Sequence, residues 1–272
     1  MRYVQSTLAG EGNDGVGEVA CSRAMNPSRL PGLSYALNPY VGCAHACSYC
    51  YAQDVLRLGQ RGEWGSWAEA KRNLEARLSA ELRRAKPGVI GLGTVTDPYQ
   101  PAEAKRGLTR GCLEILRERN HPVCIQTKSD LALRDLELIA GHQSPEVGFT
   151  ITTTDESLAR GLEPGAPKPS ARLGAAMAFA DAGVKTWVFL GPVIFGVNDS
   201  EESVKAVVGG AADAGASKVI FDFYRSKPLA DARMRATFGE DFFPRKRAPG
   251  VEATARKACM ERGIGFELAF SR

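Results

Sequence analysis

The chain has 272 residues, of which 44% are apolar and 24% are charged. This length supports a large core without disulfides or structural metals, and the ordinary composition excludes disordered and fibrous proteins. Lys and Arg exceed Asp and Glu by 35 to 31, which permits an anionic partner without requiring one. No apolar run approaches the ~20 residues of a membrane helix, and the N-terminus lacks a signal-peptide apolar region. We therefore expect a cytoplasmic protein without membrane contact.

The order of apolar and turn-forming residues predicts how the chain is organised. Residues 1–33 are rich in glycine and irregular, and they predict an N-terminal arm. From about residue 87, apolar β-branched runs alternate with helical patterns at intervals of roughly 30 residues, the period of a βα unit. The expected strands are residues 34–40, 89–96, 122–128, 147–153, 184–194 and 218–224. The expected helices are residues 67–85, 107–120, 131–141, 172–183 and 200–215.

This alternation predicts an α/β fold with a parallel sheet. Six strands with about six helices are too few for a closed eight-fold barrel. We expect a partial (βα)6 TIM-like barrel over residues 34–224, with a doubly wound sheet as the alternative. Residues 225–272 are expected to form a C-terminal covering extension that ends in a helix over 251–263 and a short strand over 264–270.

Three of the seven cysteines crowd into the loop GCAHACSYCYA, which directly follows the first expected strand. Cys43, Cys47 and Cys50 have the spacing C-x3-C-x2-C. Three thiolates on one loop can ligate three irons of a 4Fe-4S cluster and leave the fourth iron open to a non-protein ligand. The alternative is a structural zinc site with His45 as fourth ligand, but such sites usually use two paired loops. The spacing favours the cluster.

Further motifs carry a family resemblance. They are Tyr49 before the third cysteine, TVTDPYQPAE (94–103), TKSDLALRDLELI (127–139), the segment 150–173 and GPVIFGVND (191–199). Together they resemble, in order over roughly residues 35–200, the spore photoproduct lyase-like branch of the radical S-adenosylmethionine (radical SAM) superfamily. The resemblance implies a partial barrel and a 4Fe-4S cluster whose open iron binds S-adenosylmethionine.

The resemblance also implies an activity. One electron, from a donor such as flavodoxin or ferredoxin, would cleave S-adenosylmethionine reductively. The resulting 5′-deoxyadenosyl radical would abstract hydrogen from an unidentified substrate. Two classes of protein remain as alternatives, namely a zinc-stabilised nucleic-acid-binding module and a non-catalytic iron–sulfur redox sensor.

Five side chains are implied by the resemblance to lie near the bound cofactor: Tyr49, Thr96, Lys128, Thr150 and Arg172. Thr96 and Lys128 end expected strands, where parallel barrels gather their chemistry, and Thr150 lies on the strand expected over 147–153. Lys128 is expected to pair with the carboxylate of the methionine moiety. Other readings remain open, because a lysine at a strand end is often only solvated and β-propensity alone supplies threonine. Arg172 could equally be a surface charge.

Two stretches bear on the substrate. Spore photoproduct lyase carries a hydrogen-donating cysteine beside the end of its second strand, and the matching stretch 91–99 has none. We therefore do not expect repair of DNA photoproducts. Residues 225–247 hold seven Lys or Arg against three acids, interleaved with aromatic residues. This composition suits a nucleotide or nucleic-acid substrate, and it equally suits a covering segment that packs its Phe residues inward.

Overall fold

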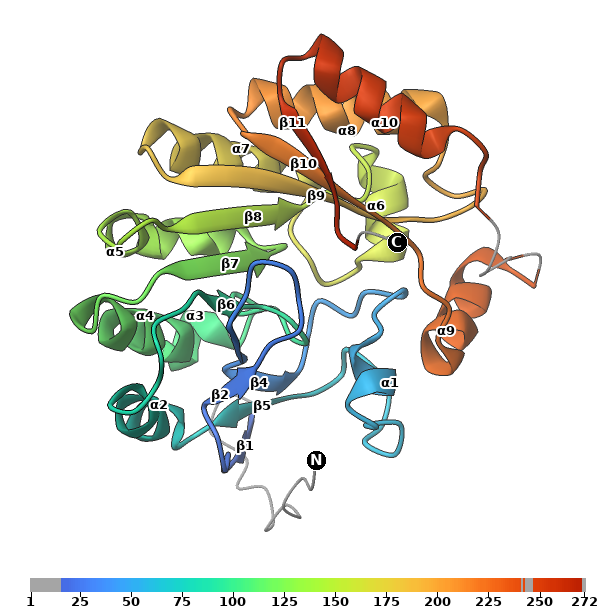
Figure 1. The fold of residues 1–272 in the computed structure, drawn as a ribbon. Helices are drawn as coiled ribbons and strands as arrows, with labels where there is room; N and C mark the ends of the chain where they lie inside the picture. The colour runs from blue at the N-terminus through green and yellow to red at the C-terminus, as the bar shows by residue number, and fades with distance from the viewer. Residues whose placement is uncertain (1–15, 241, 243–246, 271–272) are drawn as a thin grey trace.

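The computed structural model describes residues 16–240, 242 and 247–270. Within these residues the main sheet has eight strands (Figure 1). Seven of them run parallel to their neighbours, and only β2 at one edge is antiparallel. In spatial order the strands are β2 (Met25–Pro27), β3 (Tyr35–Leu37), β6 (Ile90–Leu92), β7 (Val123–Thr127), β8 (Glu146–Thr150), β9 (Lys185–Val193), β10 (Lys218–Phe223) and β11 (Gly265–Leu268).

The order of the strands decides between the two expected architectures. From β3 to β10 each strand pairs with the next strand of this sheet along the chain. A doubly wound sheet would reverse its order part of the way across. The expected α/β fold with a partial barrel is therefore confirmed, and within the described residues β2 and β11 form open edges.

The N-terminal part of the chain differs from the prediction. Residues 34–40 supply β3 and the start of β4 (Tyr40–Gly42), which belongs to a second sheet of order β1-β5-β4. In this small sheet β5 (Ala68–Lys71) replaces the beginning of the helix expected over 67–85. The expected irregular arm contains β1 (Gly17–Val19) as well as β2. Such short strands leave too few alternations to be recognised in sequence.

Helices cover the outer face of the main sheet. Amphipathic α4 buries Cys112, Leu113 and Leu116, and α8 buries Val204, Val207 and Val208. The helices are α1 (Ala52–Val55), α2 (Leu74–Leu82), α3 (Glu103–Arg106), α4 (Leu108–Glu118), the 3-10 helix η1 (Asp130–Asp135), α5 (Leu136–Ala140), α6 (Glu156–Leu162), α7 (Pro169–Asp181), α8 (Glu201–Asp213), α9 (Pro228–Phe238) and α10 (Val251–Glu261). In the described part of the chain, none of these helices has the length and apolarity needed to cross a bilayer.

The C-terminal segment does more than cover the barrel. Its strand β11 extends the main sheet by pairing with β10, and α10 packs on α8. Its helix α9 lies against α1, on the side of the molecule to which the arrowheads of β7 and β8 point (Figure 1). The basic residues Arg245 and Lys246, which contribute to the charge of this segment, lie outside the described residues.

Candidate functional site

The three clustered cysteines lie on the loop that joins β4 to α1. Cys43 and Cys47 are 8% and 6% exposed, and Cys50 is partly buried. Ala46 has a left-handed φ of 55°, and the N–H of Cys50 donates to the carbonyl of Cys47 at 3.1 Å, so the loop folds back on itself. Burial raises the pKa of Cys43 to about 12 and raises the pKa values of Cys47 and Cys50 as well. Metal binding would therefore have to displace protons from these thiols.

Two glycines enclose this cysteine loop. A Cβ atom at Gly65 would lie 2.3 Å from the Cβ of Ala46, and one at Gly165 would lie 2.1 Å from the carbonyl oxygen of Ala44. Gly165 also donates its N–H to the carbonyl of His45 at 3.0 Å. The approach is closer than any side chain permits, so the turn after α6 and the segment before β5 fit tightly around the loop.

The donor set fits a cluster better than a single ion. Within residues 16–240, 242 and 247–270, no three His, Cys, Asp or Glu side chains converge so as to hold one metal ion. His45 directs its Nδ1 at the Oδ2 of Asp97, 3.3 Å away, and in the described part of the chain it belongs to no group of three or more such ligands. The ligands of a cubane bind different irons and need not converge on a single point. The thiols of Cys43, Cys47 and Cys50 suit a group of this kind.

Asp97 joins the loop after β6 to the end of β7. It accepts hydrogen bonds from the hydroxyl of Thr127 at 2.6 Å and from the N–H of Lys128 at 2.7 Å. Burial alone would raise the pKa of Asp97, but His45 and the surrounding donors outweigh it and lower that pKa to about 2. The ionised carboxylate therefore fixes the backbone from which the Lys128 side chain projects.

Lys128 carries an uncommitted charge beside the cysteine loop. Its Nζ lies 5.6 Å from the centre of the Tyr49 ring. Among the residues that the structure describes, no side chain or carbonyl forms a hydrogen bond or ion pair with the ammonium of Lys128. Burial opposes its charge, but the neighbouring Cys47 and Glu163 outweigh that effect and raise the pKa of Lys128. A cation with free donors at this place suits an anionic ligand.

Beneath Lys128, Tyr49 is held by a buried ion pair. Its hydroxyl donates to one carboxylate oxygen of Glu163, and the guanidinium of Arg172 donates to the other. Arg172 is 1% exposed, so the surface-charge reading of this residue is wrong. Its other hydrogen bonds go to the carbonyls of Pro167 at 2.7 Å and Thr150 at 3.1 Å. Arg172 therefore supports the site through Glu163 and Tyr49.

The two predicted threonines are also buried. Thr96 donates its hydroxyl to the carbonyl of Gly42 at 2.6 Å, just before the first cysteine. Gln100 donates to the same Thr96 oxygen at 3.0 Å and accepts the N–H of Ala44 at 2.9 Å. Thr150 accepts from the Gln126 side chain at 3.2 Å. Direct contact of either threonine with a cofactor stays a prediction.

Three residues of the site were missed in the sequence. Glu163 and Gln100 lie inside the motifs that carry the family resemblance, and that position was the available signal. Arg233 was counted only as part of a basic segment, yet its guanidinium donates to the carbonyls of Ser48 and Cys50 in the cysteine loop. No local pattern distinguishes Arg233 from its basic neighbours.

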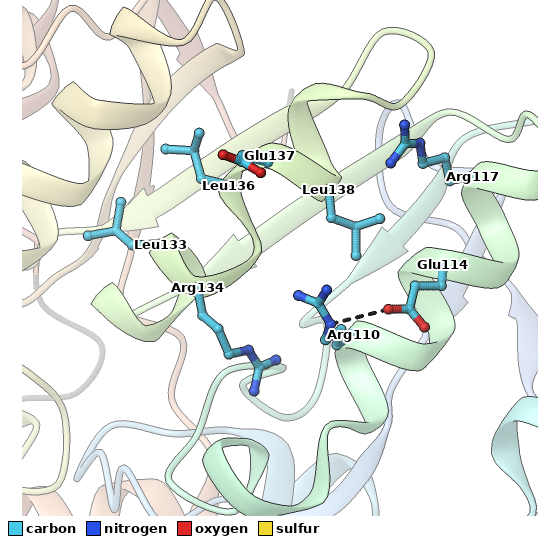
Figure 2. A pocket seen from close by; sticks show the side chains of 8 residues that line it. All are labelled: Arg110, Glu114, Arg117, Leu133, Arg134, Leu136, Glu137 and Leu138. Carbon is cyan, nitrogen blue, oxygen red and sulfur yellow. Dashed lines mark ion pairs between the residues drawn. The ribbon is translucent and has the colours of Figure 1, made fainter.

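A hollow of about 760 Å³ lies elsewhere, between α4 and the η1–α5 segment. Figure 2 shows its lining, in which Arg110 is ion-paired with Glu114. None of its eight lining residues belongs to the cysteine loop or to the five predicted cofactor side chains. Its arginines Arg110 and Arg134 are both paired with the buried Asp135, at 2.6 and 2.7 Å. The hollow is therefore separate from the candidate site.

Comparison with protein families and curated proteins identifies the family of this chain. The model of the radical SAM superfamily matches residues 37–207, more than half of the chain. An uncharacterized protein of Methanocaldococcus jannaschii is 35% identical over 184 residues, which are 68% of this chain and 70% of that protein. An uncharacterized protein of Mycobacterium tuberculosis is 37% identical over 214 residues, 74% of this chain but only 63% of the relative.

Solved structures share the fold at lower sequence identity. Spore photoproduct lyase with bound AdoMet and dinucleoside spore photoproduct superposes with a TM-score of 0.68 at 16% identity, over 91% of this chain and 79% of that chain. SuiB of Streptococcus suis, bound to its precursor peptide SuiA, gives a TM-score of 0.60 at 15% identity, over 86% and 48% of the two chains. Because the family match spans the cysteine loop and strands β6 to β9, the chain belongs to the radical SAM superfamily of enzymes, as the resemblance predicted.

Proposed function

We propose that Cys43, Cys47 and Cys50 hold a 4Fe-4S cluster and that the chain cleaves S-adenosylmethionine reductively. The observation that carries this proposal is the position of three thiols, two of them buried and one partly buried, on one loop beside the unpaired Lys128 ammonium. When bound, the cluster would supply one electron to the sulfonium, and the 5′-deoxyadenosyl radical released would abstract hydrogen from an unidentified substrate.

The side chains around the loop have separate tasks in this proposal. Lys128 binds the carboxylate of the methionine moiety, since its donors are free and its charge is stabilised by nearby anions. Tyr49, fastened by Glu163, fixes the ring beside which that ammonium lies. Thr96 and Gln100 brace the start of the cysteine loop and thereby set the position of Cys43.

Three further parts of the proposal concern partners and location. An external electron donor such as flavodoxin or ferredoxin would reduce the protein, and both would reside in the cytoplasm. The basic composition of residues 225–247 supports a nucleotide or nucleic-acid substrate less strongly once the partners of these residues are known. Within the basic segment Arg225 pairs with Asp222 at 2.9 Å, and Arg233 is directed into the cysteine loop.

Repair of a thymine photodimer is not part of the proposed reaction. Thr94 lies beside the end of β6, and its hydroxyl accepts from the Asn38 side chain at 2.9 Å. A hydroxyl does not replace a thiol as a hydrogen-atom donor, because its bond to hydrogen is stronger. Incubation with photodimer-containing DNA, a reductant and S-adenosylmethionine should therefore yield no complete repair. Stoichiometric conversion to two thymines would contradict this assignment.

The central test uses anaerobically reconstituted protein. We expect about four irons and four sulfides per chain, broad absorption near ~400 nm and 5′-deoxyadenosine after addition of dithionite and S-adenosylmethionine. A loaded protein that forms no 5′-deoxyadenosine would favour the redox-sensor alternative. One tightly bound zinc per chain without sulfide would overturn the proposal as a whole.

A further inference from the structure

Helix α9 is attached directly to the cysteine loop and to α1, although it lies outside the motifs that carry the family resemblance. The carboxylate of Asp54 in α1 accepts the first N–H groups of α9, from Leu229 at 3.0 Å and Ala230 at 3.2 Å. Ser48 of the loop donates its hydroxyl to the sulfur of Met234 at 3.2 Å. The C-terminal segment is therefore fixed against the face of the loop that carries Cys50.

Arg233 of α9 makes several side-chain contacts with the loop and with α1. Its guanidinium donates to the carbonyl of Ser48 at 3.2 Å, to the carbonyl of Cys50 and to the Gln53 side chain at 2.6 Å. It also lies over the ring of Trp64, 5.8 Å from the ring centre. Three acceptors and an aromatic face hold the fork in one orientation, so the charge is fixed in place.

A fixed cation changes what happens at a neighbouring cluster. Arginine keeps its charge at every working pH. The potential of a thiolate-ligated cluster depends on nearby charge and on hydrogen bonds. Reduction adds a negative charge, which a cation near Cys50 stabilises more than it stabilises the oxidised form.

We propose that Arg233 is a positioning residue which holds a positive charge against the Cys50 end of the cysteine loop and raises the reduction potential of the cluster. This inference rests on the proposed function. It assigns to the C-terminal segment the task of making one-electron reduction easier. Basic charge in that segment would then serve the cluster in place of a substrate.

Arg235 provides a matched control, because it belongs to the same helix and carries the same charge. Its side chain makes no hydrogen bond or ion pair with a residue in the described part of the chain. Comparing Arg233→Gln with Arg235→Gln therefore separates the charge at the loop from the charge of the helix in general. Arg233→Lys retains the charge and loses the forked geometry.

The experiment is a spectroelectrochemical titration of the reconstituted full chain, followed by absorbance and by electron paramagnetic resonance. At a fixed applied potential we expect Arg233→Gln to lower the ratio of reduced to oxidised cluster at least tenfold, which corresponds to 59 mV for one electron. Arg235→Gln should change this ratio less than twofold, and Arg233→Lys should give an intermediate value. A helix that only braces the loop would alter cluster retention without this ordered series of potentials.

Each outcome decides the inference. An unchanged potential in loaded Arg233→Gln, or an equal shift in Arg235→Gln, overturns it. If Arg233→Gln assembles no cluster, the neutral variant Arg233→Met decides, because its unbranched side chain keeps more of the packing on the loop: a potential equal to that of the wild type overturns the inference, and a lowered one supports it. Wild-type protein that assembles no cluster overturns the proposed function and this inference together, whereas a loaded wild type with unresponsive variants overturns the inference alone.

Discussion

Two networks in this molecule pair arginine with a buried carboxylate. In one, Glu163 holds Arg172 and Tyr49 beneath the cysteine loop. In the other, Asp135 holds Arg110 and Arg134 beside the hollow between α4 and α5. Both carboxylates have fully buried side chains, and both accept a hydrogen bond from a tyrosine.

The two networks differ in what surrounds them. Lys128 lies over Tyr49 with its donors uncommitted and with thiols nearby, whereas the arginines of the outer network are already paired. The hollow of about 760 Å³ adjoins the paired network. We therefore place the proposed cofactor site at the unpaired cation beside the thiols, and not at the hollow or at the other buried carboxylate.

The largest expected effect is loss of the cluster from the first region. Replacing Cys43, Cys47 or Cys50 by Ala should abolish binding of iron and sulfide, because each thiolate would ligate a separate iron of the proposed cluster. Cys112→Ala is the control, since Cys112 is buried in α4 without neighbouring cysteines of that spacing. Iron and sulfide analysis after anaerobic reconstitution checks both results. Full cluster content in any of the three loop variants would remove the basis of the assignment.

Glu163→Gln and Asp135→Asn compare the networks directly. Glu163→Gln leaves Arg172 buried without its countercharge, and we expect a loss of about 3–5 kcal/mol in the free energy of unfolding together with weaker S-adenosylmethionine binding. Asp135→Asn should cost less, because Arg110 and Arg134 have side chains 45% and 28% exposed that water can solvate. Urea unfolding and cofactor titration measure these effects. If Asp135→Asn weakened the binding of S-adenosylmethionine as much as Glu163→Gln does, the two networks would be coupled.

Lys128→Ala tests the uncommitted cation itself. Removing a charge-assisted hydrogen bond costs about 1.5–3 kcal/mol, so S-adenosylmethionine should bind roughly tenfold to a hundredfold more weakly. Cluster content should stay unchanged, because the cysteine loop belongs to a different part of the chain. Arg117→Ala, in the lining of the outer hollow, should leave the affinity unchanged. The titration is followed by the electron paramagnetic resonance signal of the cluster, and equal affinities would return Lys128 to a solvated role.

The smallest expected effect concerns the pH dependence of folding through Asp97. The pKa of Asp97 is lowered from 3.8 to about 2 in the folded chain, which corresponds to a contribution on the order of 2 kcal/mol. A carboxyl group whose pKa is lower in the folded chain than in the unfolded chain stabilises the folded state at pH values above its unfolded-state pKa. The contribution of Asp97 is therefore present above pH 3.8 and is lost as the pH falls toward 2. The free energies of unfolding of the cluster-free wild type and of Asp97→Asn should therefore become equal as the pH is lowered from 3.8 to about 2. A constant difference between them would show that the folded pKa is not depressed.

The sequence determined the parts of this protein that depend on local pattern. Apolar runs at a regular interval predicted six parallel strands, and these strands lie in the main sheet in chain order. The spacing of Cys43, Cys47 and Cys50 predicted one loop bearing three thiols. The cysteine spacing is a pattern within a few residues, and the strand interval is a repetition along the chain. Patterns of both kinds can be recognised in a single sequence.

Only the tertiary structure decided the contacts between distant segments. Ala68–Lys71 became strand β5 because β1 and β4 pair with it on both sides, although its own pattern is helical. Arg233 reaches the carbonyl of Cys50 across 183 residues of sequence, and Tyr49 reaches Glu163 across 114. The physical reason is that a charged side chain acquires its partner from packing, so its local sequence does not distinguish a solvated cation from one that holds the cysteine loop.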